Sequence, residues 1–138
     1  MQCQFDHIVL NIEDDAKMLA FYSQVLMLEP ERIDEYFAGD VPFPSVRLNP
    51  VTVIDLFPKA LWEGGQQKGQ ANLNHFCLTL DKDDWQALLE RLEANSVPIE
   101  EGPVIRWGAQ GSGTSFYFRD PEANLIEARY YDRSAGSS

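Results

Sequence analysis

The chain has 138 residues, of which 44% are hydrophobic, and it carries 22 acidic against 11 basic side chains for a net charge of −11. This length and composition fit one globular domain, residues 1–138, with a substantial core, whereas the negative charge argues against a nucleic-acid partner. Two cysteines are too few for a disulfide framework, and no leader-like segment or membrane-crossing apolar run is present. We therefore expect a cytoplasmic protein without a membrane partner, in which Cys77 is a buried free thiol.

The first half of the chain predicts a strand, a helix and then three further short strands. Segment 5–12 (FDHIVLNI) has the composition of a strand. Asp14 and Asp15 follow where a helix cap and the helix dipole favour negative charge, and the apolar residues that come next at helical spacing are Met18, Leu19, Tyr22, Val25 and Leu26. The helix should end before Pro30, and extended runs separated by turn-forming residues lead to the strand 53–57 (VIDLF).

The second half repeats this plan. Segment 73–80 (LNHFCLTL) predicts a strand, Asp83 and Asp84 precede a helix that should end before Pro98, and segment 125–129 (LIEAR) closes the half. We expect an α+β fold of two βαβββ modules, at about 5–58 and 73–132. A polar linker at about 59–72 should join them, and the small polar tail 133–138 should be disordered.

One histidine and one carboxylate recur at matched positions of the two modules. His7 and His75 are 68 residues apart and each begins a strand, while Asp55 and Glu127 are 72 residues apart and each lies in a closing strand. Alternation places Ile8, Leu10 and Ile12 on the helix side and His7 on the opposite face, and His75 is oriented likewise. If the two small sheets curve into a shared trough, all four polar side chains can point into it.

Four such residues in a trough predict one site for a divalent metal ion. Two carboxylates that converge on an apolar trough would repel each other and resist desolvation unless a cation lay between them. Imidazole and carboxylate ligands suit Fe, Mn, Co, Ni or Zn, and four protein ligands leave positions open for a chelating substrate. A metal-free groove with solvated side chains is the alternative.

The motifs FDHIVLNIEDDAKMLAFYSQVL, VIDLF, LNHFCLTL and FRDPEANLIEARYY resemble the vicinal oxygen chelate superfamily, which includes glyoxalase I, bleomycin resistance proteins and extradiol dioxygenases. The resemblance covers the chain up to Tyr131 and implies that paired βαβββ modules form a curved mixed-sheet cup. It implies the metal ligands His7, Asp55, His75 and Glu127. Aspartate at 55 departs from the glutamate, glutamine or histidine of many relatives, and its shorter reach leaves open whether it coordinates directly or through water.

The resemblance also narrows the chemistry. Extradiol ring cleavage in this family looks to need a further histidine, and none is left here after His7 and His75. Proton transfer of the glyoxalase or epimerase type needs only a Lewis-acid metal and a carboxylate base. We therefore expect a metal-dependent lyase or isomerase acting on a small molecule, with Glu127 or Asp55 as the base. The alternatives are a metal-free protein that sequesters an antibiotic or metabolite, and an extradiol-type dioxygenase.

Four further residues are candidates for substrate binding. Tyr36, Arg47, Arg106 and Trp107 should flank the trough, and either arginine would suit a substrate carboxylate or phosphate, although packing or surface ion pairs would explain them equally well. The run 106–113 (RWGAQGSG) could form a mobile lip over the cup. The resemblance implies a homodimer, and the sequence leaves open whether one site is built within a chain or between two.

Overall fold

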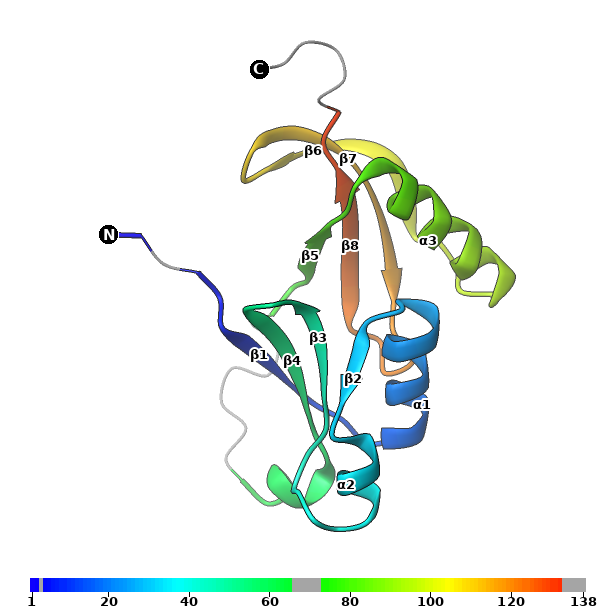
Figure 1. Cartoon of the computed structure of the whole chain (residues 1–138). Coiled ribbons are helices and arrows are strands. Elements are labelled where there is room, and N and C mark those ends of the chain that lie inside the picture. Colours follow the sequence, from blue (N-terminus) through cyan, green and yellow to red (C-terminus); the bar gives the residue numbers. More distant parts are fainter. Residues whose placement is uncertain (3, 66–72, 133–138) are drawn as a thin grey trace. The chain divides into compact units, whose positions relative to one another are not determined.

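The computed structural model describes residues 1–2, 4–65 and 73–132, and the chain divides into two compact units, Met1–Lys68 and Gly69–Ser138. Each unit contains one four-stranded sheet, and the two are described in turn (Figure 1). Among the described residues, no helix is long and apolar enough to cross a membrane.

The sheet of the first unit has the strand order β1-β4-β3-β2. β1 runs parallel to β4, and the other neighbours are antiparallel. The elements in chain order are β1 (His7–Asn11), α1 (Asp15–Ala20), the π-helical turn η1 (Phe21–Val25), β2 (Glu29–Glu31), α2 (Ile33–Phe37), β3 (Ser45–Asn49), β4 (Thr52–Phe57) and the 3-10 turn η2 (Lys59–Leu61).

The first helix covers the apolar face of this sheet. The side chain of Asp14 caps α1 by accepting a hydrogen bond of 3.0 Å from the backbone N–H of Lys17. Met18 and Tyr22 are fully buried in the same core as Ile12 and Leu56. Burial of this apolar stripe, more than intrinsic propensity, holds so short a helix in place.

The sheet of the second unit has the equivalent order β5-β8-β7-β6, with β5 parallel to β8. Its elements are β5 (Phe76–Thr79), α3 (Lys82–Ala94), β6 (Glu101–Gly108), β7 (Gly111–Arg119) and β8 (Leu125–Tyr130). Asp81, not Asp83 or Asp84, is the N-cap of α3, and those two acids lie in its first turn where the helix dipole favours them.

Trp85 anchors α3 to this sheet. Its indole N–H donates a 2.9 Å hydrogen bond to the carbonyl of Ala128, and its ring contacts those of Phe116 and Tyr130 with centroids 5.0 and 4.8 Å away. Trp85, Phe116 and Ala128 are all buried. The apolar residues of β7 and β8 that alternate toward α3 therefore form the core, which leaves their other face for polar side chains.

The predicted α+β fold of two βαβββ modules is confirmed, with differences in detail. α2 was not expected, the first helix ends in a π turn, and η2 lies inside the segment expected as linker. The prediction for Cys77 is wrong: the thiol is exposed, because Cys77 shares the sheet face of His75 while Phe76 and Leu78 alternate to the other side. Cys3, the rest of the linker (66–72) and the tail 133–138 lie outside the described residues.

The run 106–113 is not a loose lip but the end of a β-hairpin. β6 and β7 stay paired through Gly108 and Gly111, and only residues 109–110 form the turn. The hydroxyl of Tyr131 accepts a hydrogen bond from the backbone N–H of Gln110, at 3.2 Å. Backbone pairing thus continues to the tip of the segment.

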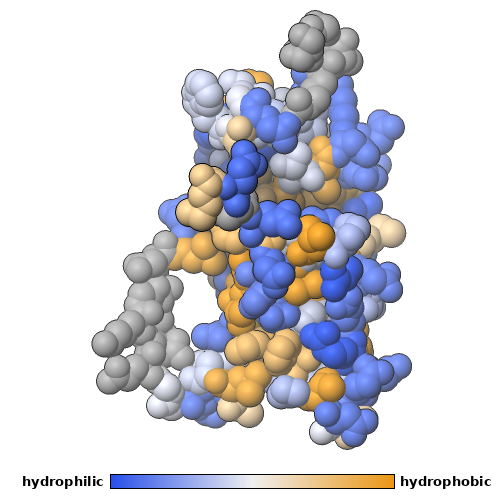
Figure 2. Space-filling model, turned by 60° about the vertical axis from the view of Figure 1, so that its left-hand side comes forward, coloured by the Kyte–Doolittle hydropathy of each residue, from blue (hydrophilic) through white to orange (hydrophobic). Residues whose placement is uncertain are grey.

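Large hydrophobic side chains remain exposed in both units, among them Phe5, Ile105 and Trp107. The face shown in Figure 2 is mainly hydrophilic, with hydrophobic residues visible among the polar ones. This mixture is ordinary for a protein surface.

Candidate metal centre

A histidine and a carboxylate lie in contact in the second unit. His75 directly precedes β5 and Glu127 lies in β8, and the parallel pairing of these strands places Cys77 beside Glu127. The Nε2 atom of His75 is 3.0 Å from Oε1 of Glu127. The Glu127 side chain is 5% exposed and that of His75 is 33% exposed, so the pair is reachable from the side of the histidine.

The orientation of His75 is fixed by its neighbours. Its Nδ1 atom lies 2.7 Å from Oδ1 of Asn74, and its ring meets that of Tyr117 edge to face at 5.7 Å between centroids. Because an amide oxygen can only accept, a hydrogen bond to Asn74 requires a hydrogen on Nδ1, and Nε2 then faces Glu127. A histidine held through one ring nitrogen so that the other faces a carboxylate has the arrangement typical of a metal ligand.

The second oxygen of Glu127 is held by two donors. Oε2 accepts 2.6 Å from the hydroxyl of Ser115 and 2.7 Å from Nη2 of Arg129. Burial by itself would raise the pKa of Glu127, but the hydrogen bonds from Ser115, Arg129 and His75 together with the charge of Arg129 outweigh it, so the pKa lies below its ordinary value. Glu127 is thus kept as a carboxylate with one oxygen restrained and the other directed at His75.

The first unit contains a related pair. Nε2 of His7 lies 4.0 Å from Oδ2 of Asp55, and Nδ1 of His7 lies 2.8 Å from Oδ2 of Asp6. The His7 side chain is 47% exposed, and its pKa is raised mainly by the hydrogen bond to Asp6 and further by the charge of Asp55, against a smaller opposing effect of burial. His7 and Asp55 therefore lie close together without a direct hydrogen bond.

Two serines that sequence reasoning missed hold the carboxylates. Ser45 donates a 2.6 Å hydrogen bond to Oδ1 of Asp55, as Ser115 does to Glu127, and both serines are fully buried. Arg32 in turn donates to the hydroxyl of Ser45 at 2.5 Å. The repeat itself was a signal, because each serine lies in the strand next to an acid-bearing strand. The strand register places Ser45 opposite Asp55 but Ser115 opposite Arg129, two residues from Glu127 on the same face, so the serine contacts follow only from the structure.

The structure therefore brings the four predicted ligands together as two pairs, one in each unit. Within the described parts of either unit, no third histidine, cysteine, aspartate or glutamate completes a group of metal-ligating side chains. The donor chemistry of each pair fits a divalent ion, since imidazole nitrogen and carboxylate oxygen are ordinary ligands of zinc and its neighbours. Two donors each about 2.1 Å from an ion and at right angles to it would lie about 3 Å apart, which is compatible with the spacing of His75 and Glu127.

Tyr36 does not lie on the histidine face of its sheet. It belongs to α2, and its hydroxyl donates a 2.7 Å hydrogen bond to Oδ2 of Asp15 at the start of α1. Burial and this hydrogen bond raise the pKa of Tyr36 to about 12. The observed contact of Tyr36 is structural, joining α2 to α1.

Arg47 shares the sheet face of Asp55 and is engaged in an ion pair. Its Nε lies 2.5 Å from Oε2 of Glu31, and this contact lowers the pKa of Glu31 and raises that of Arg47. Arg47 also lines a groove of about 480 Å3, whose other lining residues are Gln4, Asp6, Pro50, Val51 and Val53. This groove reaches the residue that holds His7, because Asp6 is part of its wall.

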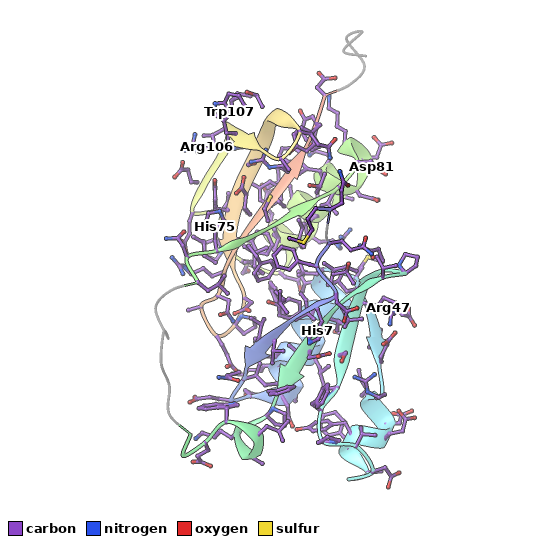
Figure 3. The ribbon with its side chains drawn as sticks, turned by 90° about the vertical axis from the view of Figure 1, so that its left-hand side faces the viewer. His7, Arg47, His75, Asp81, Arg106 and Trp107 are labelled. Carbon is purple, nitrogen blue, oxygen red and sulfur yellow. The ribbon has the colours of Figure 1, made fainter. Side chains whose placement is uncertain are left out.

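Arg106 lines a groove together with the second histidine, whereas Trp107 does not; Figure 3 labels the three residues. A groove of about 340 Å3 is lined by Asn74, His75, Glu100, Glu101, Arg106, Tyr117 and Leu125. In this groove Arg106 is ion-paired with Glu101. Trp107 follows Arg106 in β6, so its side chain lies on the opposite face and is 84% exposed, and only its backbone carbonyl contacts the site, through Arg129.

Comparison with known proteins agrees with this architecture. The family model described as "Glyoxalase/Bleomycin resistance protein/Dioxygenase superfamily" matches residues 4–128. Virulence protein STM3117 from Salmonella typhimurium is 32% identical over 129 residues, which cover 93% of this chain and 84% of that protein. The integron cassette protein VCH_CASS1 from the mobile metagenome of V. cholerae is 29% identical, with a TM-score of 0.73 over 96% of this chain and 98% of that one.

A third similar structure is the lactoylglutathione lyase from Agrobacterium tumefaciens. It is 21% identical and has a TM-score of 0.66 over 98% of both chains. At this identity the likeness is one of fold.

Proposed function

Because the chain belongs to the glyoxalase/bleomycin resistance protein/dioxygenase superfamily, we propose that it is a divalent-metal-dependent enzyme acting on a small molecule that binds the metal through two neighbouring oxygens. The reaction we propose is a proton transfer of the glyoxalase or epimerase type, catalysed by a lyase or isomerase. The ligands would be His75 and Glu127 from one unit, and His7 and Asp55 from the other unit, of the same chain or of a second copy.

The contact between His75 and Glu127 carries this proposal. Oε1 of the buried carboxylate of Glu127 lies 3.0 Å from Nε2 of His75, so the lone pairs of the two atoms face each other unless a hydrogen on Nε2 or a metal ion bound by both atoms lies there. The same arrangement recurs in weaker form at His7 and Asp55. A protein that binds its ligand without metal has no evident need for two such pairs.

A bound divalent ion would act as a Lewis acid that polarises the substrate oxygens and stabilises the charge of an enolate. The residues of the chain would supply the remaining chemistry. Oε1 of Glu127 when it is released from the ion, or a carboxylate oxygen of Asp55 if Asp55 contacts the ion only through water, would remove the proton next to the polarised carbonyl and return it to the neighbouring carbon. Asn74 and Asp6 would keep the histidines oriented throughout.

The groove beside His75 is where we place part of the substrate. Arg106 and Tyr117 line it together with Glu101, which neutralises Arg106 in the ion pair. A substrate carboxylate or phosphate would have to replace Glu101 as the partner of Arg106. The groove that contains Arg47 would take a substrate group bound by the first unit.

Metal analysis tests the proposal. Protein purified without chelator or histidine tag should contain a near-stoichiometric divalent ion, and a His75→Ala, Glu127→Ala double variant should lose it. Glu93→Gln is the matched control, because Glu93 is an exposed carboxylate of the same unit that lies in α3 and does not line the groove. The loaded protein would then be assayed with hemithioacetals, 2-oxo thioesters and catechols, and turnover of catechols alone would replace the lyase or isomerase with a dioxygenase.

Protein that holds no ion, gains none on addition of Fe, Mn, Co, Ni or Zn salts and binds small molecules without turnover would overturn the proposal. The chain would then be a sequestering protein of the bleomycin resistance type.

We further propose that the protein is a homodimer, on the family resemblance, and that it is located in the cytoplasm, on the low cysteine content. Sedimentation of the purified protein tests the first of these.

A further inference from the structure

The geometry points to Arg129 as a positioning residue that holds Glu127 with a single oxygen directed at His75 and ties this carboxylate to the strand that carries Arg106. The inference rests on the proposed function, because it gives Arg129 a part in building the metal site. It assigns a role to a residue that does not itself contact the metal or substrate.

The guanidinium of Arg129 is buried, with 3% of the residue exposed, and both of its terminal nitrogens have partners. Nη2 donates to Oε2 of Glu127 at 2.7 Å and to the carbonyl of Trp107 at 2.8 Å. Nη1 lies 3.3 Å both from the carbonyl of Arg106 and from the hydroxyl of Tyr131. One side chain of β8 therefore links the carboxylate in its own strand to the backbone of β6.

These bonds restrict how Glu127 can bind a metal ion. Oε2 already accepts from Ser115 and Arg129, so only Oε1 faces His75. If the carboxylate rotated so that both oxygens could bind the ion, the buried hydrogen bond from Ser115 and the charge-assisted one from Arg129 would both break. Glu127 should accordingly bind through one oxygen.

The space for the guanidinium is provided by two glycines. A Cβ added at Gly108 would overlap Nη1 of Arg129 and the hydroxyl of Tyr131, and one at Gly113 would approach the carbonyl of Tyr130 to 2.9 Å and Nη1 of Arg129 to 3.3 Å. Gly108 does not have a left-handed backbone, so the space it leaves open, not its conformation, is what excludes a side chain there. The absence of a side chain at Gly108 thus leaves the volume that the guanidinium of Arg129 occupies.

The first unit shows that the fold does not need an arginine at this position. The residue two places after Asp55 is Phe57, where Arg129 stands two places after Glu127. There Arg32 reaches the carboxylate only indirectly, through Ser45. A buried cation is costly unless its partners are well placed, and a hydrophobic residue would often be as stable, so the pairing with Glu127 favours a role in the site.

The test is a titration of metal-free protein with Co2+, with affinity measured by calorimetry and coordination by the visible spectrum. Arg129→Met removes the guanidinium, Arg129→Lys restores a charge with fewer directed donors, and Gly108→Ala displaces the guanidinium without removing it. Arg91→Met and Gly65→Ala are matched controls, since Arg91 lies in the last turn of α3 and does not line the groove beside His75, and a Cβ at Gly65 would meet nothing closer than 3.4 Å. Circular dichroism and thermal unfolding confirm that each variant is folded.

We expect Arg129→Met and Gly108→Ala to weaken Co2+ binding about 10- to 100-fold and to change the Co2+ spectrum, with Arg129→Lys between them and wild type. The controls should bind as wild type does. Folded Arg129→Met and Gly108→Ala proteins with unchanged affinity and spectrum would overturn the inference while leaving the metal site intact. Wild-type protein that binds no divalent ion would instead overturn the proposed function, and the inference with it.

Discussion

Ser45 and Ser115 stand in the same relation to the two carboxylates of the molecule: each is fully buried and donates a 2.6 Å hydrogen bond to one oxygen, of Asp55 and Glu127 respectively. The internal repeat thus includes the serines that hold the candidate carboxylate ligands as well as the ligands themselves. In each unit the oxygen that the serine does not hold is the one nearest the histidine.

Removing either serine hydroxyl should destabilise the fold. Ser115→Ala leaves a buried carboxylate oxygen with one donor fewer, and we expect a loss of about 1–3 kcal/mol of unfolding free energy, with a similar loss for Ser45→Ala. Urea unfolding at neutral pH measures both. Ser112→Ala, at an exposed position of the same strand as Ser115, should be near neutral, and equal effects of Ser112→Ala and Ser115→Ala would contradict the prediction.

Substitution of Trp85 should destabilise the fold far more than substitution of Trp107. Trp85→Ala removes a buried ring packed on Phe116 and Tyr130 and should cost about 3–5 kcal/mol. Trp85→Phe keeps most of the packing but leaves the carbonyl of Ala128 without its donor, for about 1–3 kcal/mol. Trp107→Ala, at an exposed side chain, should change the unfolding free energy by less than about 0.5 kcal/mol. The free energies of the three variants from urea unfolding compare the two sites, and a large effect at Trp107 would show that its surface is covered.

Protonation of Glu127 should contribute to the loss of unfolding free energy at acid pH. Its pKa in the folded protein lies below the ordinary value of 4.5, so its ionisation stabilises the fold above pH 4.5 and this stabilisation is lost as the pH falls through the folded-state pKa. Glu127→Gln cannot titrate and should lose less unfolding free energy than wild type between about pH 6 and pH 3. Parallel acid dependences of the two proteins would rule out this contribution.

His7 should titrate above its ordinary pKa of 6.5 because Asp6 favours the imidazolium. The ion-pair stabilisation is then complete below pH 6.5 and disappears as the pH rises through the higher folded-state pKa. Asp6→Asn gives His7 the neutral neighbour that His75 has in Asn74, and it should move the His7 pKa down toward 6.5. Proton NMR of the His7 imidazole resonances measures this pKa in wild type and in Asp6→Asn, and an unmoved His7 pKa would exclude the role of Asp6.

Divalent metal ions should stabilise the folded chain. An ion that binds only the folded state at about 100 times its Kd adds about 2.7 kcal/mol, so Tm should rise on adding the preferred ion and fall back with excess EDTA. Glu127→Gln should show a much smaller rise. A rise of equal size in wild type and Glu127→Gln would mean that the ion binds elsewhere.

The repeated fold and the face of each strand were predictable from the sequence because they depend on local alternation. Leu10 and Ile12 are buried and Val9 is exposed, as their spacing requires. The same alternation placed His75 with Cys77, so the exposure of Cys77 could have been predicted had the strand face been given more weight than the general burial of free cysteine. Trp107 could similarly have been assigned to the face opposite Arg106.

The support of the site could not be read in this way. Ser115 contacts Glu127 and Arg129 contacts the carbonyls of Arg106 and Trp107 only because antiparallel strands pair in one particular register. That register includes irregularities between Glu101 and Val104 and between Arg47 and Asn49, which a single sequence does not reveal. The short α2 has few apolar residues facing a core, which explains why periodicity did not predict it and why the contact of Tyr36 with Asp15 was missed.

The fit of Arg129 against Gly108 also restricts how this sequence can change. A side chain at 108 and a guanidinium at 129 would occupy the same volume, so the two positions must vary together: a relative with alanine or a larger residue at the first should have a shorter residue at the second. Such a relative would have to support its glutamate from another strand, as the first unit of this chain already does through Arg32 and Ser45. The two units of this chain therefore hold their carboxylates in two ways, Glu127 by direct contact with an arginine and Asp55 by an arginine that acts through a serine.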